Sequence, residues 1–99
     1  MIPQEKLDGL LKRHEELGNA IARPDQLPGG EYGKLSRELS ELSPIVETVL
    51  SLKQARKELD DLKAIIADKD SDAEMKSLAK DEMYQIEKLI PNLERQVQM

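Results

Sequence analysis

The chain has 99 residues, of which 38% are hydrophobic and 35% charged, and it contains no Cys, Trp or Phe. This length fits one small domain and is too short for two. The absence of cysteine excludes disulfides, thiolate nucleophiles and cysteine-ligated metals. Lys and Arg number 15 against 20 Asp and Glu, giving a net charge of −5. This balance disfavours sequence-blind binding of nucleic acid, and we expect no DNA partner.

The hydropathy pattern also limits where the chain can reside. No stretch approaches the roughly 18 consecutive apolar residues that a membrane span requires. The first residues are polar, unlike the basic and then apolar start of a signal peptide. We therefore expect a soluble, cytoplasmic chain with no membrane contact.

The first predicted element is a helix over about residues 3–22. Pro3 suits a first helical turn and Pro24 suits a position just past the end of a helix. Two prolines and two glycines between residues 23 and 30 predict a loop in which the chain reverses. The apolar stripe of this helix, spaced by three and four, consists of Leu7, Leu10, Leu11, His14, Leu17 and Ile21.

The second predicted element is a long helix over about residues 31–67. Its apolar positions recur with a mean step near 3.5 residues, the heptad value of coiled-coil-like packing. Pro44 interrupts this pattern, and Ser43 before it is a good N-cap residue. The pattern therefore allows either one kinked helix or two helices that meet at Ser43.

The third predicted element is a helix over about residues 72–98. Ser71 and Glu74 have the spacing of a capping box, which predicts the start of a helix. Pro91 lies inside the apolar stripe, and because Ile90 is a poor N-cap we expect a kink there and not a new helix.

Together these elements predict an all-α fold, an elongated antiparallel three-helix bundle formed by a single domain over residues 1–99. The middle helix is kinked or broken near Ser43-Pro44. It is longer than either neighbour, so we expect the first helix to cover it up to about residue 51 and the last helix to cover it back to the low forties. Both neighbours are then expected to pack on residues 41–51. Such narrow bundles offer little concavity for a substrate.

Three motifs suggest chemistry but lack the residues to perform it. Asp68, Asp70 and Asp72 imitate the start of a calcium-binding loop, but the required later glycine and glutamate positions are both alanine. The segment 29–34 resembles a phosphate-binding loop, but position 28, where the first glycine is required, is a proline. His14, the only histidine, is expected to be a partly buried structural residue. We therefore predict no enzyme activity, no metal, no cofactor and no small-molecule substrate.

Lys53, Arg56 and Lys57 form the densest basic spot of the sequence. They are explained either by a solvated helix face or by a contact with phosphates of RNA. Residues 60–82 hold eight acidic residues against four lysines, so this end is expected to repel RNA and to suit a basic protein surface.

Three stretches resemble the N-terminal domain of bacterial peptide chain release factors, and the likeness covers essentially that whole domain. They are LDGLLKRHEELGNAIARPD (7–25), YGKLSRELSELSPIV (32–46) and AEMKSLAKDEMYQIEKLIPNLERQ (73–96). The chain is more similar to release factor 1 than to release factor 2, because its first loop lacks the Phe-Trp pair expected in the latter.

The resemblance implies that the chain is part of a longer factor whose catalytic Gly-Gly-Gln and codon-reading tripeptide lie elsewhere. It implies a non-catalytic module that docks near the stalk base of the large ribosomal subunit and contributes to the interplay with a translational GTPase. Lys53, Arg56 and Lys57 are then the candidate ribosome or RNA contacts. The alternative is a generic helical adaptor or coiled-coil domain unrelated to termination, which helical periodicity alone does not distinguish.

Overall fold

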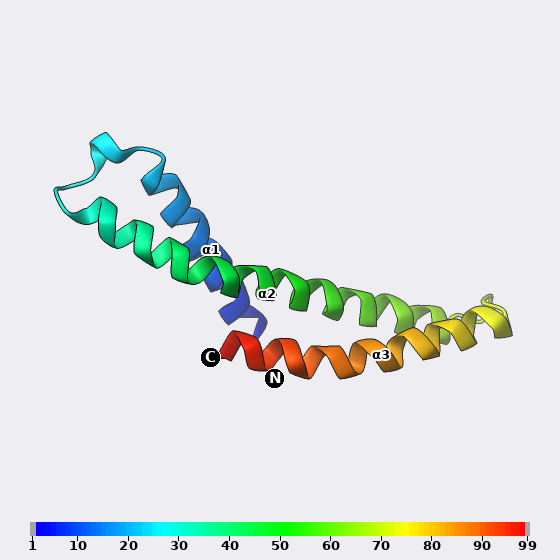
Figure 1. The fold of residues 1–99 in the computed structure, drawn as a ribbon. Coiled ribbons are helices and arrows are strands. Elements are labelled where there is room, and N and C mark those ends of the chain that lie inside the picture. The colour runs from blue at the N-terminus through cyan, green and yellow to red at the C-terminus, as the bar shows by residue number, and fades with distance from the viewer. Residues whose placement is uncertain (1, 99) are drawn as a thin grey trace. The chain divides into compact units, whose positions relative to one another are not determined.

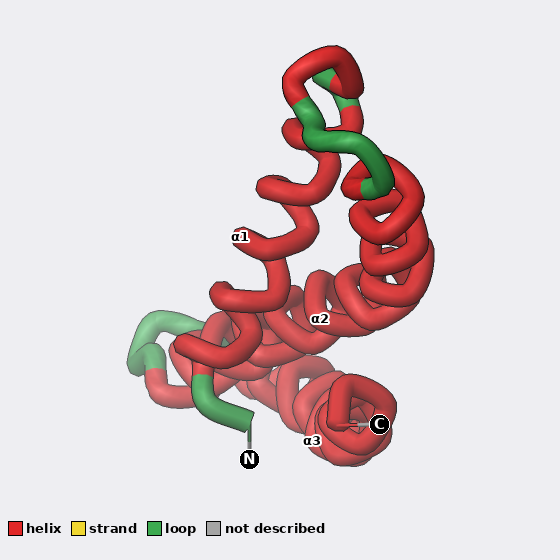
Figure 2. Tube along the Cα trace, turned by 90° about the vertical axis from the view of Figure 1, so that its left-hand side faces the viewer, coloured by secondary structure: helices red, strands yellow, loops and turns green. Residues whose placement is uncertain are grey.

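A computed structural model describes residues 2–98, and these residues are helical apart from short connections (Figures 1 and 2). The helices are α1 (Gln4–Ile21), the short 3₁₀ helix η1 (Pro24–Gln26), α2 (Glu31–Ala67) and α3 (Ala73–Gln98). No strand occurs between residues 2 and 98. The predicted all-α class is confirmed, and the predicted helix bounds agree to within one residue. None of the helices in this range has the length and apolarity that crossing a lipid bilayer demands.

The chain forms two compact units, Met1–Val49 and Leu50–Met99, and α2 contributes to both. In each unit a part of α2 packs against one antiparallel neighbour, α1 in the first unit and α3 in the second (Figure 1). The predicted antiparallel packing of both outer helices against the middle one is therefore confirmed.

The first unit is held by an apolar seam and two polar contacts. Arg13 donates two hydrogen bonds to Glu38 from one edge of its guanidinium, with Nε–Oε2 and Nη2–Oε1 distances of 2.6 and 2.9 Å. The hydrogen bond from Arg13 lowers the pKa of the Glu38 carboxyl. His14 Nε2 lies 3.2 Å from Ser43 Oγ. The buried apolar residues of this unit include Ile2, Leu7, Leu17, Val46 and Val49.

The second unit buries small and branched side chains along the α2–α3 seam. Alternation of apolar residues by three and four on both helices places them on facing stripes. The buried residues are Leu52, Ala55 and Leu62 from α2 and Ala79, Leu93 and Val97 from α3.

Pro44 lies inside α2 and does not end it. Of the two alternatives at Ser43-Pro44, the structure therefore shows the continuous helix. Ser43 is not an N-cap, because its hydroxyl donates to the carbonyl of Leu39 one turn earlier at 2.8 Å. Thr48 makes the same kind of bond to the carbonyl of Pro44 at 3.2 Å. In α3, Pro91 likewise lies inside one helix, so no new helix starts there.

The cap of α3 differs from the predicted capping box. The amide of Met75 donates to Asp72 Oδ1 at 2.8 Å, so Asp72 is the capping residue. The expectation that Ser71 and Glu74 form the cap is wrong by one position. Aspartate and serine are comparable N-caps, and Asp72 also places a carboxylate at the positive end of the helix dipole.

Candidate functional site

The predicted basic spot lies on the part of α2 that belongs to the second unit. Lys53 and Lys57 are one helical turn apart, and Arg56 is displaced from them around the helix axis. The structure therefore keeps the three residues close together along α2, but gives them different surroundings.

Arg56 is mostly enclosed between α2 and α3. Its side chain is 15% exposed and its Nη2 lies 3.9 Å from Oε2 of Glu94, whose side chain is 17% exposed. A guanidinium held against a carboxylate in this way joins the two helices, and removing one partner leaves a partly desolvated charge. Arg56 thus has a structural task within the second unit.

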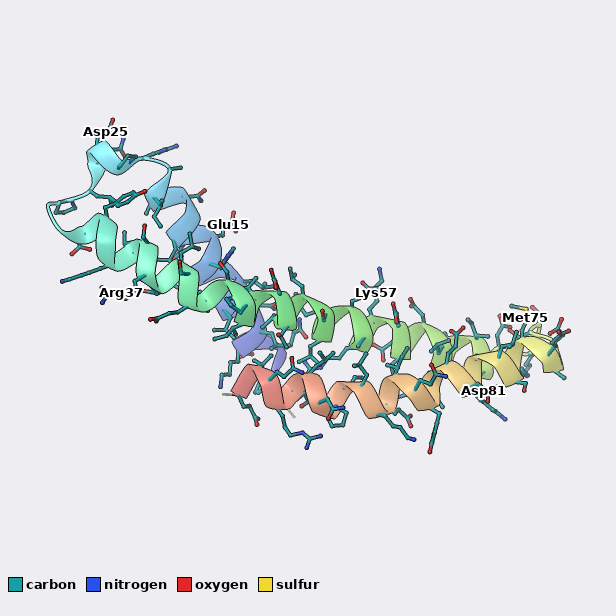
Figure 3. All side chains as sticks on the ribbon, in the orientation of Figure 1. Glu15, Asp25, Arg37, Lys57, Met75 and Asp81 are labelled. Atoms are coloured by element: carbon teal, nitrogen blue, oxygen red, sulfur yellow. The ribbon has the colours of Figure 1, made fainter. Side chains whose placement is uncertain are left out.

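Lys57 is the most accessible of the three predicted residues. It is exposed and extends from the side of α2 away from α3 (Figure 3). Lys53 is half-buried. The three cations therefore differ in access to solvent, since Lys57 is exposed while Lys53 and Arg56 are half-buried.

The aspartates of the α2–α3 loop are used by the backbone. Asp68 Oδ1 accepts the amide of Asp70 at 2.9 Å, and Asp72 caps α3. No group of three His, Cys, Asp or Glu residues within the described range is placed to hold a metal ion. The arrangement is that of a turn followed by a helix start.

The Gly29-Gly30 segment is a turn into α2. Gly30 has φ +85°, a conformation that favours glycine, and the amide of Glu31 bonds to the carbonyl of Pro28 at 3.1 Å. The glycines therefore serve chain reversal.

His14 is half-buried in the first unit, as expected for a structural histidine. Because the single hydroxyl proton of Ser43 is donated to Leu39, the Ser43 oxygen accepts from His14, which requires a proton on Nε2. This proton is present in one neutral tautomer and in the charged ring alike. His14 therefore acts here as a donor that links α1 to α2.

Several large apolar side chains of α2 and α3 are exposed, among them Leu50 and Leu89. Leu50 and Leu89 have exposed fractions of 53% and 47%. Each stands beside another apolar residue, Val49 or Ile90, and two consecutive helical residues cannot face the same way. This pairing is the sequence signal that one member of each pair faces outward.

The sequence of this chain matches the PCRF domain family over residues 10–99. The chain belongs to that family. The resemblance to release factor domains is therefore confirmed over nearly its whole length.

Individual relatives agree with this assignment. The peptide chain release factor 1 of Anaplasma marginale (strain Florida) is 34% identical over 96 residues, which are 97% of this chain and 27% of the relative. The factor of the same name from Agathobacter rectalis is 35% identical over 96 residues, covering 96% of this chain and 26% of the relative. The chain thus spans about a quarter of the length of these relatives. No solved structure matches it.

Proposed function

We propose that this PCRF domain is a non-catalytic module of a translation termination factor and docks near the stalk base of the large ribosomal subunit. The observation that carries the proposal is the family match over residues 10–99, together with relatives named peptide chain release factor 1. The exposed side of α2 around Lys57 supplies the positive charge that a contact with ribosomal RNA needs.

The role of the domain in this proposal is positional. It stabilises the factor in the ribosomal A site, while hydrolysis of the peptidyl-tRNA ester is performed by the rest of the factor. A translational GTPase is the second proposed partner. The alternative, a generic helical adaptor, predicts no affinity for ribosomes.

The first test measures co-sedimentation of the 99-residue chain with large ribosomal subunits over a salt series. We expect specific but weak binding, with a Kd above about 1 μM, because the domain holds only one of the contact surfaces of a whole factor. Absence of binding at low salt contradicts the proposal. Addition of the chain to ribosomes that carry peptidyl-tRNA should release no peptide, and release would contradict the non-catalytic role.

A charge reversal tests the basic contact. Lys57→Glu should weaken ribosome binding and reduce the salt dependence of log K by roughly one phosphate contact. Lys63→Glu is the matched control, since it makes the same charge change at another exposed lysine of α2. Arg56 is left intact because its substitution also disturbs the contact with Glu94. If both variants bind ribosomes equally well, Lys57 belongs to a solvated helix face and does not contact the ribosome.

A further inference from the structure

Two shallow hollows lie along one edge of the α2–α3 seam in the second unit. One has a volume of about 400 Å³ and the other about 130 Å³. Glu58 lines both, and the two neighbouring hollows are together called the groove. The remaining lining residues are Leu50, Ser51, Gln54, Ala55 and Leu89 for the first hollow, and Asp61, Leu62, Glu82 and Ile86 for the second.

The groove has an apolar floor and apolar shoulders. Ala55 and Leu62 are buried beneath it, and Ile86 is half-buried. Leu50 and Leu89 stand at one end with about half of each side chain exposed. Exposed leucines beside buried apolar residues are typical of a surface that another chain covers.

All ionisable residues that line the groove are acidic. Glu58, Asp61 and Glu82 line it, and no Lys or Arg does. Within residues 2–98, none of the three carboxylates has an ion pair with a basic side chain. Glu58 accepts a hydrogen bond from the neutral Gln54 at 3.0 Å, which leaves its charge uncompensated.

From this combination we infer that the groove docks an amphipathic helix of a partner protein, with leucine-like side chains on one face and Lys or Arg beside them. An apolar helix face fits the apolar floor, and its flanking cations meet the three carboxylates. From Leu50 to Asp61 the groove follows α2 for about 16 Å, the length of about three helical turns.

Charge excludes the other classes of occupant. Phosphates of RNA or of an anionic membrane would face Glu58, Asp61 and Glu82 at close range, which is unfavourable. A second copy of this chain would bring the same acidic rim against itself and carries the same net charge of −5. The inference concerns a different surface chemistry from the proposed contact at Lys57 and does not depend on ribosome binding.

The test uses the 99-residue chain and a fluorescent synthetic helical peptide of about five turns, with leucines on one face and lysines on the other. Anisotropy titration should show saturable one-to-one binding, and amide NMR shifts should map to the groove residues. A peptide of identical composition in scrambled order should bind at least about tenfold more weakly, because it cannot present an apolar face.

Two variants with equal net charge decide where the peptide binds. Glu58→Gln, Asp61→Asn and Glu82→Gln together should weaken binding on the order of tenfold. The matched control combines Glu15→Gln, Asp60→Asn and Glu87→Gln, three exposed carboxylates that do not line the groove, and should bind within about twofold of the parent.

The apolar part is tested by Leu89→Gln, which should also weaken binding of the amphipathic peptide. Because Leu89 is about half exposed, the variant should remain folded, as helical circular dichroism will verify. The inference would be overturned if the two triple variants lost the same amount of affinity for the peptide. It would also be overturned if the scrambled peptide bound as tightly as the amphipathic one. Either result would mean that the peptide is attracted by net charge alone. Self-association of the chain that Leu89→Gln abolishes would assign the groove to a second copy and overturn it as well.

Discussion

Leu52 and Leu50 lie two residues apart on α2, yet the first is fully buried and the second is 53% exposed. We therefore expect Leu52→Ala and Leu50→Ala to differ greatly in their effect on stability. Truncating a fully buried leucine removes its transfer free energy and leaves a cavity, at a cost of about 3 kcal/mol. A chain of 99 residues has a free energy of unfolding of roughly 5–15 kcal/mol, so this loss is a large fraction of the total. For Leu50→Ala we expect a change below about 0.5 kcal/mol.

The measurement is urea unfolding followed by circular dichroism at 222 nm, a wavelength that reports helix content. The midpoint of Leu52→Ala should fall clearly, and its melting temperature by more than about 10 °C. The control, Leu50→Ala, removes the same atoms from the same helix and changes the helix propensity by the same amount. Equal stability of the two variants would refute the burial pattern of α2 around these residues.

Three further predictions concern local contacts. Pro44→Ala should raise the free energy of unfolding by up to about 3 kcal/mol in urea titrations, because it restores a donor inside α2; a lower stability would mean that the proline is required for packing. The parent should be more stable than Glu38→Gln by a constant amount at neutral pH. This difference should disappear as the pH falls through the lowered pKa of Glu38, because the protonated carboxyl no longer pairs with Arg13. A difference in stability that does not change with pH would contradict this. Asp72→Ala should lower the melting temperature by an amount corresponding to about 1 kcal/mol and Ser71→Ala by much less, and the reverse order would restore the predicted capping box.

The helices could be predicted from sequence because their signals are local. Apolar spacing, prolines at helix ends and glycines in the first loop act within a few residues, and the predicted bounds agree with α1, α2 and α3 to within one residue. The position of the α3 cap is ambiguous in the sequence because three aspartates and a serine lie within five residues, and each of these residue types can cap a helix or a turn.

The site was harder to predict because its geometry depends on register between helices. Arg56 looked equivalent to Lys53 and Lys57 by spacing, but its contact with Glu94 depends on how α3 is aligned with α2. Likewise, the groove combines Glu58 and Asp61 from α2 with Glu82 from α3. Sequence periodicity identifies the apolar stripe of each helix but leaves the longitudinal alignment of the two stripes undetermined.

The position of Lys57 next to the groove allows one substitution to distinguish the two proposed contacts. Lys57 is one turn before Asp61, so Lys57→Glu adds negative charge beside the acidic rim while it removes positive charge from the proposed RNA contact. Binding of the lysine-rich peptide should therefore become stronger by about twofold to fivefold, while binding to the large ribosomal subunit becomes weaker. Anisotropy titration and co-sedimentation at the same ionic strength measure the two effects, with Lys63→Glu again as the control. A change of the same sign in both assays would mean that neither contact is local to this surface, because a local charge cannot attract a cationic helix and a phosphate backbone at once.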